Sequence, residues 1–363
     1  MSANSFAARL LGWYRRHARV LPWRKHKEPW ATWVSEVMLQ QTRVEVVIPA
    51  FDRFLKRYPR PADFARASDD ELHAAWRGLG YYRRARLLRD GASDVVARHR
   101  GSVPSDLDAL GALAGVGAYT RGAIASIAFG HAEPAIDGNV ERVVARHAGI
   151  DSDVKRSATR RRIEAIVRER LPISRAGDFN QALMDLGAMV CTPRSPKCRV
   201  CPVADDCEAR RLGVEQELPR LPARRAPIAV QARAVLVRHR DGRVLGGRIE
   251  DGAVNAGQIE LPSPGILADH PDAGDALAHA LFERYGARFA IGEVVARVRH
   301  GITHHRIALE VHAATLIGRS GVRLKWHAID FDTVPWSTPS RKALRIGDLA
   351  RVRAVSDEGL ASR

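Results

Sequence analysis

Residues 191–207 read CTPRSPKCRVCPVADDC, and this stretch holds all four cysteines of the 363-residue chain. Six residues separate Cys191 from Cys198, two separate Cys198 from Cys201, and five separate Cys201 from Cys207. Sulfurs confined to so short a stretch cannot join distant parts of a large chain by disulfides. They can surround one metal centre. Zinc modules usually bring two close pairs of ligands, and only one pair is close here, so the spacing favours a 4Fe–4S cluster over zinc.

The charge balance of the chain indicates a polyanionic partner. There are 58 Lys and Arg residues against 41 Asp and Glu, a formal net charge of +17. A surplus of this size predicts binding to nucleic acid, although a coding bias toward arginine would give the same totals. No apolar run approaches the length of a membrane-spanning helix, so we expect no membrane partner. Because cysteine would be used only as a cluster ligand, we expect a reducing compartment.

The chain divides into regions of different sequence pattern. Residues 1–215 predict successive helices, because apolar positions recur at intervals of three and four between Pro, Gly and Ser. Residues 216–228 are rich in Pro and Arg and predict a linker. Residues 229–363 predict a helix and short strands, over Asp275–Tyr285, Ala232–Val237, Val294–Val298 and Ile307–Leu316. The expected fold is a mainly α domain followed by a smaller α+β domain.

Local patterns set the expected limits of the first helices. Residues 1–27 lack acidic side chains, as transit peptides do. A structural helix is favoured instead by apolar residues at helical spacing, namely Phe6, Leu10, Trp13 and Tyr14. A second helical stripe runs from Trp30 to Gln41. Ser105 and Asp108 have the spacing of a capping box at the start of a later helix.

Three segments of the helical region carry side chains suited to chemistry. In Trp33–Val44, WVSEVMLQQTRV, Glu36 falls off the apolar stripe and is a candidate catalytic residue, or else a partner of the helix dipole. Two glycines in Leu113–Gly117, LAGVG, make a tight turn into a helix whose free N–H groups can hold a phosphate, although many helix hairpins use glycine only to turn. Asp137, in IDGNV, is placed to cap a helix, or to stabilise a nearby cation.

Several segments of the chain share a pattern known from one family. They are LPW at Leu21–Trp23, SEVMLQQT at Ser35–Thr42, GLGYY at Gly78–Tyr82, AGVGAYT at Ala114–Thr120, IDGNVERV at Ile136–Val143, FNQALMDLGAMVCT at Phe179–Thr192, and the cysteine loop. From Phe6 to Cys207 the chain resembles the MutY-type adenine DNA glycosylases, which belong to the iron–sulfur-containing helix-hairpin-helix glycosylases. The resemblance implies a helix-hairpin-helix domain with one 4Fe–4S cluster on the four cysteines. It also implies hydrolysis of the N-glycosidic bond of adenine mispaired with 8-oxoguanine.

The resemblance implies that two carboxyl groups divide the chemistry. Glu36 matches the general acid that protonates adenine, and Asp137 matches the carboxylate that faces the oxocarbenium-like sugar. Cleavage of a C–N bond at a sugar needs both a proton donor at the leaving group and negative charge near the anomeric carbon. Tyr119 and Asn139 match positions that orient the sugar or the water. In endonuclease III-type enzymes a Lys at the position of Tyr119 attacks the sugar; because tyrosine forms no imine, we expect a monofunctional glycosylase.

The resemblance also assigns residues to DNA contact. Gln41 matches a side chain that enters the base stack, and Tyr81 matches a wedge beside 8-oxoguanine, although ordinary packing would also account for both. Arg24 matches the edge of the adenine pocket. The turn Gly115-Val116-Gly117 matches the hairpin that binds DNA phosphate.

Residues 229–363 resemble the Nudix-like domain that recognises 8-oxoguanine in this family. Where the family has Phe-Ser-His, this chain has Ile302-Thr303-His304, so Thr303 keeps a hydroxyl and His304 keeps its ring. The acidic residues of Asp275–Glu293 are scattered, and we therefore do not expect metal-dependent pyrophosphate hydrolysis.

The expected partner is duplex DNA that contains adenine opposite 8-oxoguanine or guanine, bound by a monomer at the nucleoid in a bacterial cytoplasm. Two alternatives stay open. An endonuclease III-like glycosylase and lyase for oxidised pyrimidines would share the cysteine loop and the glycine turn. A noncatalytic iron–sulfur DNA-binding protein would share the charge as well, and would have no turnover to lose when Glu36 is changed.

Overall fold

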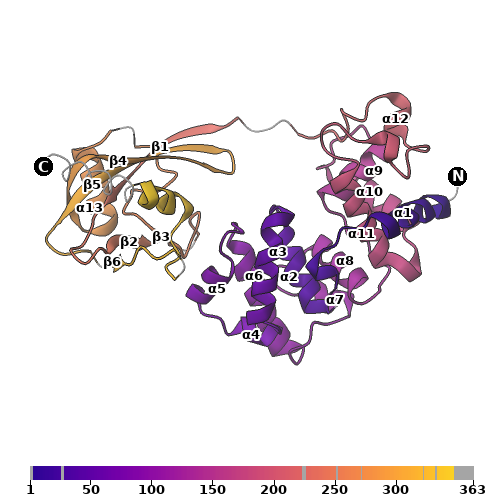
Figure 1. Cartoon of the computed structure of the whole chain (residues 1–363), viewed down its shortest axis with the longest axis horizontal. Coiled ribbons are helices and arrows are strands. Elements are labelled where there is room, and N and C mark those ends of the chain that lie inside the picture. Colours follow the sequence, from indigo (N-terminus) through magenta and orange to yellow (C-terminus); the bar gives the residue numbers. More distant parts are fainter. Residues whose placement is uncertain are drawn as a thin grey trace, which may run out of the picture. The chain divides into compact units, whose positions relative to one another are not determined.

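The computed structural model describes residues 3–25, 28–222, 226–250, 252–270, 272–321, 323–331 and 333–346. The chain forms two compact units, one of Met1–Ala67 with Ala75–Ala223 and one of Ser68–Ala74 with Arg224–Arg363. The main boundary between the units follows residue 223. The region before this boundary is helical, and the region after it has helices and two sheets (Figure 1). The predicted fold class, mainly α followed by α+β, is confirmed. None of the described helices is long and apolar enough to cross a membrane.

The region before the boundary is built from helices joined by short turns. Their bounds are α1 Ala3–His17, α2 Pro29–Leu39, α3 Val44–Arg57, α4 Pro61–Ala65, α5 Asp69–Ala75, α6 Arg83–Arg98, α7 Leu107–Gly111, α8 Ala118–Ile127, α9 Gly138–His147, α10 Ser157–Arg170, α11 Ala176–Met189 and α12 Glu208–Leu212. Short 3-10 turns cover Pro22–Arg24, Ile173–Arg175 and Cys198–Val200.

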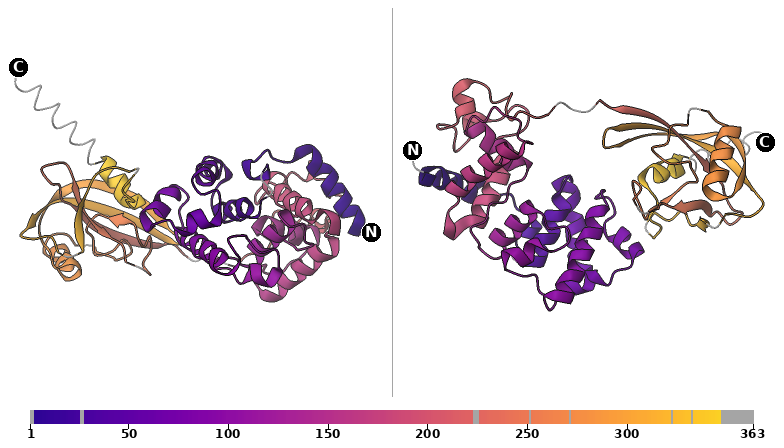
Figure 2. Two further views of the ribbon diagram at one scale, coloured as in Figure 1. Left: turned by 90° about the horizontal axis from the view of Figure 1, so that it is seen from below. Right: turned by 180° about the vertical axis from the view of Figure 1, so that it is seen from behind.

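Helix α1 packs against helices that come much later in the chain. It lies beside α10 and α11, as the views from below and from behind show (Figure 2). The side chains that predicted this helix are all buried, and the Phe6 ring lies 4.7 Å from the ring of His147 and 6.3 Å from that of Phe179. Burial of such large apolar side chains stabilises the fold by roughly 1.5–3 kcal/mol each. The prediction of a structural helix at this end is confirmed.

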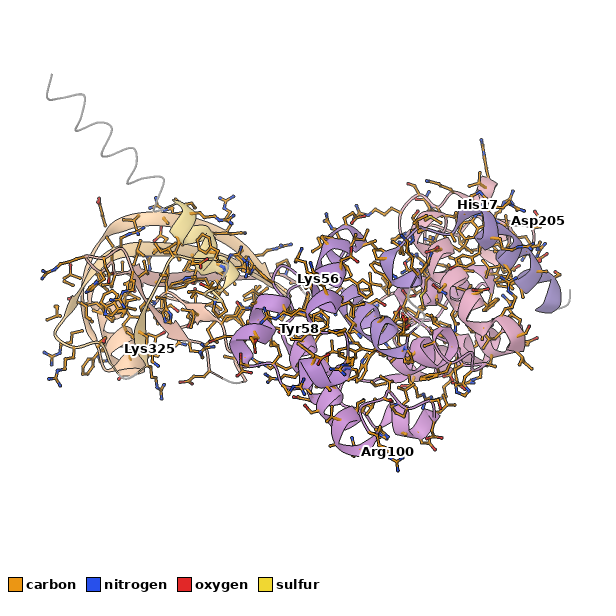
Figure 3. All side chains as sticks on the ribbon, turned by 60° about the horizontal axis from the view of Figure 1, so that its bottom comes forward. His17, Lys56, Tyr58, Arg100, Asp205 and Lys325 are labelled. Carbon is orange, nitrogen blue, oxygen red and sulfur yellow. The ribbon has the colours of Figure 1, made fainter. Side chains whose placement is uncertain are left out.

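A second core of aromatic side chains fixes the position of α2. The rings of Phe54 and Phe64 lie 4.8 Å apart, and Tyr58 packs 5.2 Å from Phe54. Tyr58, which Figure 3 labels, follows the last residue of α3, and its carbonyl accepts a 3.0 Å hydrogen bond from the indole of Trp30 in α2. Aromatic pairs of this kind add about 0.5–1.5 kcal/mol beyond area burial. This packing holds α2, which carries Glu36, against α3 and α4.

Two expected helix limits are wrong. Helix α2 ends at Leu39, and Gln41 lies beyond it in a left-handed backbone conformation with φ +57°, because the chain turns before α3. The helix at Leu107 is capped by Asp106 rather than by Ser105. The Asp106 carboxylate accepts hydrogen bonds from the N–H groups of Asp108 and Ala109 at 3.1 and 2.8 Å. Aspartate caps a helix as well as serine does, so the sequence pattern alone did not select between the two residues.

Besides the Ser68–Ala74 segment, which holds most of α5, the second unit contains two three-stranded sheets and helix α13, Asp275–Tyr285. Its strands are β1 Ile228–Leu236, β2 Val244–Arg248, β3 Ile259–Glu260, β4 Arg288–Ile302, β5 His305–Ile317 and β6 Leu324–His327. One sheet has the order β1-β5-β4, with β1 parallel and β4 antiparallel to β5. The other has the antiparallel order β3-β2-β6.

The predicted helix of this unit is confirmed over its full length, while the predicted strands are too short. Val294–Val298 was the expected strand, but β4 extends from Arg288 to Ile302. Its pairing with β5 shifts register between Ile291 and Ala296. Such irregularities break the two-residue alternation on which strand prediction depends, so the sequence pattern did not show β4 as one continuous strand.

Part of the segment predicted as a linker is bound to the first unit. Leu218 is buried, and its carbonyl accepts a 2.7 Å hydrogen bond from Nε of Arg146. The carbonyl of Arg220 accepts a hydrogen bond from the N–H of Val154 at 3.1 Å. The limits 1–215, 216–228 and 229–363 stay predictions.

Candidate active site and metal centre

A cleft of about 820 Å³ lies among the helices of the first unit. Its lining includes most of the residues that the sequence singled out there, namely Arg24, Glu36, Gln41, Gly115, Gly117, Tyr119, Asp137 and Asn139. They come from α2, from the turns around it, and from the starts of α8 and α9, and α2 packs on α8 (Figure 1). Pockets for small ligands are typically about 300–1,000 Å³, so the cleft is wide enough for one nucleotide.

Glu36 is buried in the wall of this cleft. It is 5% exposed and lies toward the C-terminal end of α2, so favourable interaction with the helix dipole does not explain it. Its Oε2 accepts a hydrogen bond from the hydroxyl of Tyr119. Burial raises the pKa of Glu36 from 4.5 to about 7; the Tyr119 hydrogen bond opposes this rise, and the charge of Asp137 adds to it. A carboxyl group with a pKa near 7 can both give and take a proton at neutral pH.

Tyr119 keeps its proton in this arrangement. Burial raises the pKa of the Tyr119 hydroxyl well above its ordinary value, and the nearby charge of Glu36 raises it further. The hydroxyl is therefore a neutral donor that fixes one oxygen of Glu36.

We expect the substitution Glu36→Gln to stabilise the protein above pH 7. The pKa of Glu36 is higher in the folded protein than in the unfolded chain. The contribution of Glu36 to the free energy of unfolding is therefore fully present below about pH 4.5, and it is lost as the pH rises to about 7. A pKa shift of this size corresponds to about 3 kcal/mol. Glutamine has no charge to bury, so urea denaturation should show a gain of roughly 2–3 kcal/mol at pH 8 and almost none at pH 4.5. The exposed Glu45→Gln is the control, and an equal gain at both pH values would contradict the assignment.

Asp137 caps helix α9 and also lines the cleft. Its Oδ1 accepts hydrogen bonds from the N–H groups of Asn139 at 2.9 Å and Val140 at 2.8 Å, which confirms the predicted cap. Its Oδ2 accepts a 2.7 Å hydrogen bond from Nδ2 of Asn139. Three donors therefore hold the carboxylate in one orientation at the edge of the cleft. Asp137 can thus cap α9 and also stabilise a cation in the cleft.

The side-chain oxygen of Asn139 is held by Arg142, which lies one turn further along α9. Nη2 of Arg142 donates to Oδ1 of Asn139 and to the carbonyl of Gly187, both at 2.8 Å, and its Nε donates to the carbonyl of Cys191 at 2.8 Å. A Cβ at Gly187 would lie 2.6 Å from Cβ of Asn139, so only glycine allows α11 to approach α9 this closely. One arginine thus joins the start of α9 to the first cysteine of the loop.

The four cysteines line one pocket, together with apolar side chains of α9 and α11. Arg146 of α9 is fully buried beside it and donates to Sγ of Cys191 at 3.4 Å and to the carbonyls of Thr192 and Pro193 at 2.7 and 3.1 Å. No three His, Cys, Asp or Glu side chains of the described residues lie close enough to share one metal ion. A 4Fe–4S cluster instead takes one thiolate on each of its four irons, so four cysteines that line one pocket fit such a cluster.

We expect Cys198→Ser to lose the cluster and to unfold more easily. Without one thiolate the loop has no cofactor to organise it, and a loss of about 2 kcal/mol would lower the thermal midpoint by roughly 4–8 °C. Iron content, the thermal midpoint and DNA affinity would be measured together. Asp205→Asn, a change of an exposed residue on the same loop, is the control that keeps all four sulfurs. A cluster-free Cys198→Ser protein with unchanged midpoint and DNA affinity would contradict the structural role.

The predicted glycine turn joins α7 to α8. Gly115 has φ +78°, and a Cβ there would lie 2.9 Å from Cβ of Leu87, so the position requires glycine for two reasons. Gly117 is the N-cap residue of α8. Both glycines line the cleft, whereas Val116 is buried and is not among the lining residues. The turn therefore presents the start of α8 to the cleft, and phosphate binding by it stays a prediction.

The residues predicted to contact DNA differ in their surroundings. Arg24 lies in the cleft wall, where its guanidinium makes two hydrogen bonds, of 2.8 and 3.0 Å, to the fully buried carboxylate of Asp185. Gln41 also lines the cleft. Tyr81 does not line it; its side chain is 54% exposed and its backbone has φ +47°.

Thr303 and His304 form the turn between β4 and β5 in the second unit. Thr303 has φ +52°, and its hydroxyl donates to the carbonyl of Ile302 at 2.7 Å. The ring of His304 packs 4.3 Å from that of His305. Their assignment to 8-oxoguanine stays a prediction.

Several residues of the site were missed by sequence reasoning. Asp185 is buried and forms ion pairs with Arg24 and Arg19. Nε of Arg19 lies 2.7 Å from Oδ1 of Asp185. Lys155 and Gln181 line the cleft. An acidic residue inside the apolar helix FNQALMDLGAM was a usable signal for Asp185, because a buried carboxylate needs cationic partners. Lys155 gave no such signal, because it lies in a loop among other basic residues.

The fold and the site define a family, which comparison with known proteins identifies. Residues 34–169 match the HhH-GPD superfamily of base excision DNA repair proteins, and residues 191–207 match the iron–sulfur binding domain of endonuclease III. Thymine/uracil-DNA glycosylase of Pyrobaculum aerophilum is 38% identical over 207 residues, which cover 56% of this chain and 90% of that protein. The chain belongs to the HhH-GPD superfamily of base excision DNA repair proteins. The prediction of one bound iron–sulfur cluster is confirmed, and the role of each cysteine as a ligand stays a prediction.

Its relatives include adenine DNA glycosylases, as the sequence resemblance predicted. The human enzyme is 45% identical over 223 residues, covering 59% of this chain and 41% of that protein. The enzyme of Buchnera aphidicola is 35% identical over 210 residues, covering 58% of this chain and 60% of that protein. The chain thus spans less than half the length of the human relative.

Solved structures show the same fold for the helical region. A thermostable thymine-DNA glycosylase has a TM-score of 0.53 at 28% identity, over 58% of this chain and 97% of that one. An endonuclease III trapped as a covalent intermediate with DNA has a TM-score of 0.50 at 24% identity, over 57% of this chain and 94% of that one. The helix-hairpin-helix fold is confirmed, and the Nudix-like nature of the second unit stays a prediction.

Proposed function

We propose that this protein is a monofunctional DNA glycosylase that releases adenine mispaired with 8-oxoguanine or guanine in duplex DNA. The observation that carries the proposal is Glu36, a buried carboxyl group with a pKa near 7, in the same cleft as the carboxylate of Asp137. Two carboxyl groups in different surroundings can divide the roles of proton donor and negative charge. The relatedness to adenine DNA glycosylases supports adenine as the substrate base.

The reaction follows from these two groups. The adenine nucleotide is extruded from the stack into the cleft. Protonated Glu36 donates its proton to a ring nitrogen of adenine, the C–N bond breaks with its electron pair on the base, and the sugar becomes an oxocarbenium-like cation. Asp137 stabilises that cation through its negative charge. Water then adds to the anomeric carbon and returns a proton to Glu36, which gives free adenine and an abasic sugar.

The other residues of the site orient these two carboxyl groups. Tyr119 fixes one oxygen of Glu36, Asn139 fixes one oxygen of Asp137, and Arg142 fixes Asn139. The cluster on the cysteine loop supplies structural order when bound and takes no part in the hydrolysis. Loop residues Arg194, Lys197 and Arg199 bring positive charge suited to DNA phosphate.

We expect Tyr119→Lys to introduce lyase activity. Tyrosine offers no amine, so the wild-type protein should give little or no covalent complex when borohydride is added during turnover. A lysine at this position would place an amine in the cleft that can form an imine with the sugar. Gel analysis of trapped protein–DNA complexes is the measurement. Strong trapping by the wild-type protein would instead favour the endonuclease III-like alternative.

Single-turnover release of adenine from duplexes that differ only in the base opposite that adenine tests the proposed function. Adenine would be placed opposite 8-oxoguanine, guanine or thymine, and the release of free adenine measured. We expect the fastest release opposite 8-oxoguanine, then guanine, and almost none opposite thymine. DNA binding without release from any duplex would favour the noncatalytic alternative.

The finer parts of the proposal extend to the second unit and to the state of the protein. We assign recognition of 8-oxoguanine to the second unit, with Thr303 and His304 at the β4–β5 turn. We also propose that the protein acts as a monomer at the nucleoid in a bacterial cytoplasm.

A further inference from the structure

Arg84, at the start of α6, lies where two loops meet. Its Nη1 donates to the carbonyls of Val37, Met38 and Gln40, the first two at 2.7 and 3.1 Å. Its Nη2 donates to the hydroxyl of Thr42 at 3.0 Å and to the carbonyls of Leu79 and Gly80 at 3.1 and 3.2 Å. One guanidinium therefore closes the C-terminal end of α2 and ties it to the loop before α6.

Each of the two loops carries one of the side chains assigned to contact with the DNA bases. Gln41 lies between Gln40 and Thr42, and Tyr81 directly follows Gly80. Both residues have left-handed backbone conformations, with φ +57° and +47°. Such conformations cost roughly 1–3 kcal/mol for a non-glycine residue and persist only where the surroundings enforce them. The contacts of Arg84 fall on the residues next to each strained position.

Arg84 also contacts the aromatic side of the second loop. Its guanidinium carbon lies 5.5 Å from the ring centre of Tyr81 and 5.7 Å from that of Trp76. The indole of Trp76 donates to the carbonyl of Gly80 at 3.1 Å, so the same loop is held from two sides. Burial lowers the pKa of Arg84 to about 10, and the group remains charged at neutral pH. The neutral oxygens around it compensate for its lost hydration.

We infer that Arg84 is a positioning residue that sets Gln41 and Tyr81 as one rigid unit for insertion into DNA. The inference rests on the proposed function and on the family resemblance, which assigns Gln41 and Tyr81 to contact with the DNA bases. A guanidinium is planar, with five N–H donors in fixed directions, and can bridge acceptors on two loops at once. A lysine keeps the charge but has a single nitrogen, so it cannot hold both loops in the same register.

The test compares Arg84→Lys with Arg83→Lys, an exposed neighbour on α6, on two DNA substrates. In one, adenine is paired opposite 8-oxoguanine in a full duplex; in the other, the same adenine lies in an unpaired bubble, where little unstacking is needed. For Arg84→Lys we expect single-turnover adenine release about 10²-fold slower on the duplex and close to wild type on the bubble. Arg83→Lys should match wild type on both. A matching fluorescence assay with 2-aminopurine at the target position should show less extrusion from the duplex.

Two results would overturn the inference. One is a wild-type rate for Arg84→Lys on the duplex, and the other is an equal loss on duplex and bubble, which would mean a general structural role. If Arg84→Lys does not fold, Thr42→Val, which removes one acceptor of Arg84, decides the matter by the same comparison with a smaller expected loss. Failure of the proposed function is recognised separately, because the wild-type protein would then release no adenine from either substrate, while 2-aminopurine extrusion would still report on Arg84.

Discussion

Replacement of Glu36 by glutamine should slow adenine release by about 10³- to 10⁴-fold while leaving DNA binding nearly unchanged. General acid catalysis contributes about 10²- to 10⁴-fold in enzymes, and Glu36 has two successive proton transfers to perform. Glutamine keeps the shape and can still accept the Tyr119 hydrogen bond, but it cannot donate a proton to the leaving base. The measurement is single-turnover release at saturating protein, with the dissociation constant determined separately. Retention of more than a tenth of the wild-type rate would remove Glu36 from the mechanism.

The pH dependence gives an independent check on the same residue. The protonated form of Glu36 is the active acid, and its pKa is about 7. The wild-type rate should therefore fall about tenfold for each pH unit above that value, and level off below it. Glu36→Gln should lack this limb of the profile, whereas Glu45→Gln should keep it. A wild-type rate that is flat from pH 6 to 9 would be incompatible with this acid.

Replacement of Asp137 by asparagine should cost about 10²- to 10³-fold in the rate of adenine release. Loss of a single preorganised electrostatic group in an active site has effects of this size. Asparagine caps a helix about as well as aspartate, so α9 should remain in place and the thermal midpoint should change little. The matched control is Asp106→Asn, which makes the same change at the cap of α7, and it should have a wild-type rate.

The same substitution should shift the pH profile in a defined direction. The negative charge of Asp137 contributes to the raised pKa of Glu36. When that charge is removed, the pKa of Glu36 should fall, and the decline in rate should begin at lower pH than in the wild type. An unchanged profile in Asp137→Asn would show that the two carboxyl groups do not interact across the cleft.

The sequence determined the cofactor loop, the fold class and most of the cleft residues. Four cysteines within seventeen positions allow few chemistries, and helical periodicity is a local property, so α1 and α13 were predictable. Glu36 and Asp137 were found because short motifs around them are specific. These features depend on neighbours close in the chain, which a single sequence displays.

Tertiary structure alone decided which side chains act together. Asp185 pairs with Arg19 and Arg24, which lie 166 and 161 residues earlier in the chain. Arg142 donates a hydrogen bond to the cysteine loop. Arg84 joins two loops that are about forty residues apart in the sequence. The raised pKa of Glu36 likewise comes from burial under helices that the sequence does not place. Charge stabilisation and desolvation depend on distance in space, and no local pattern encodes the distance between residues far apart in the chain.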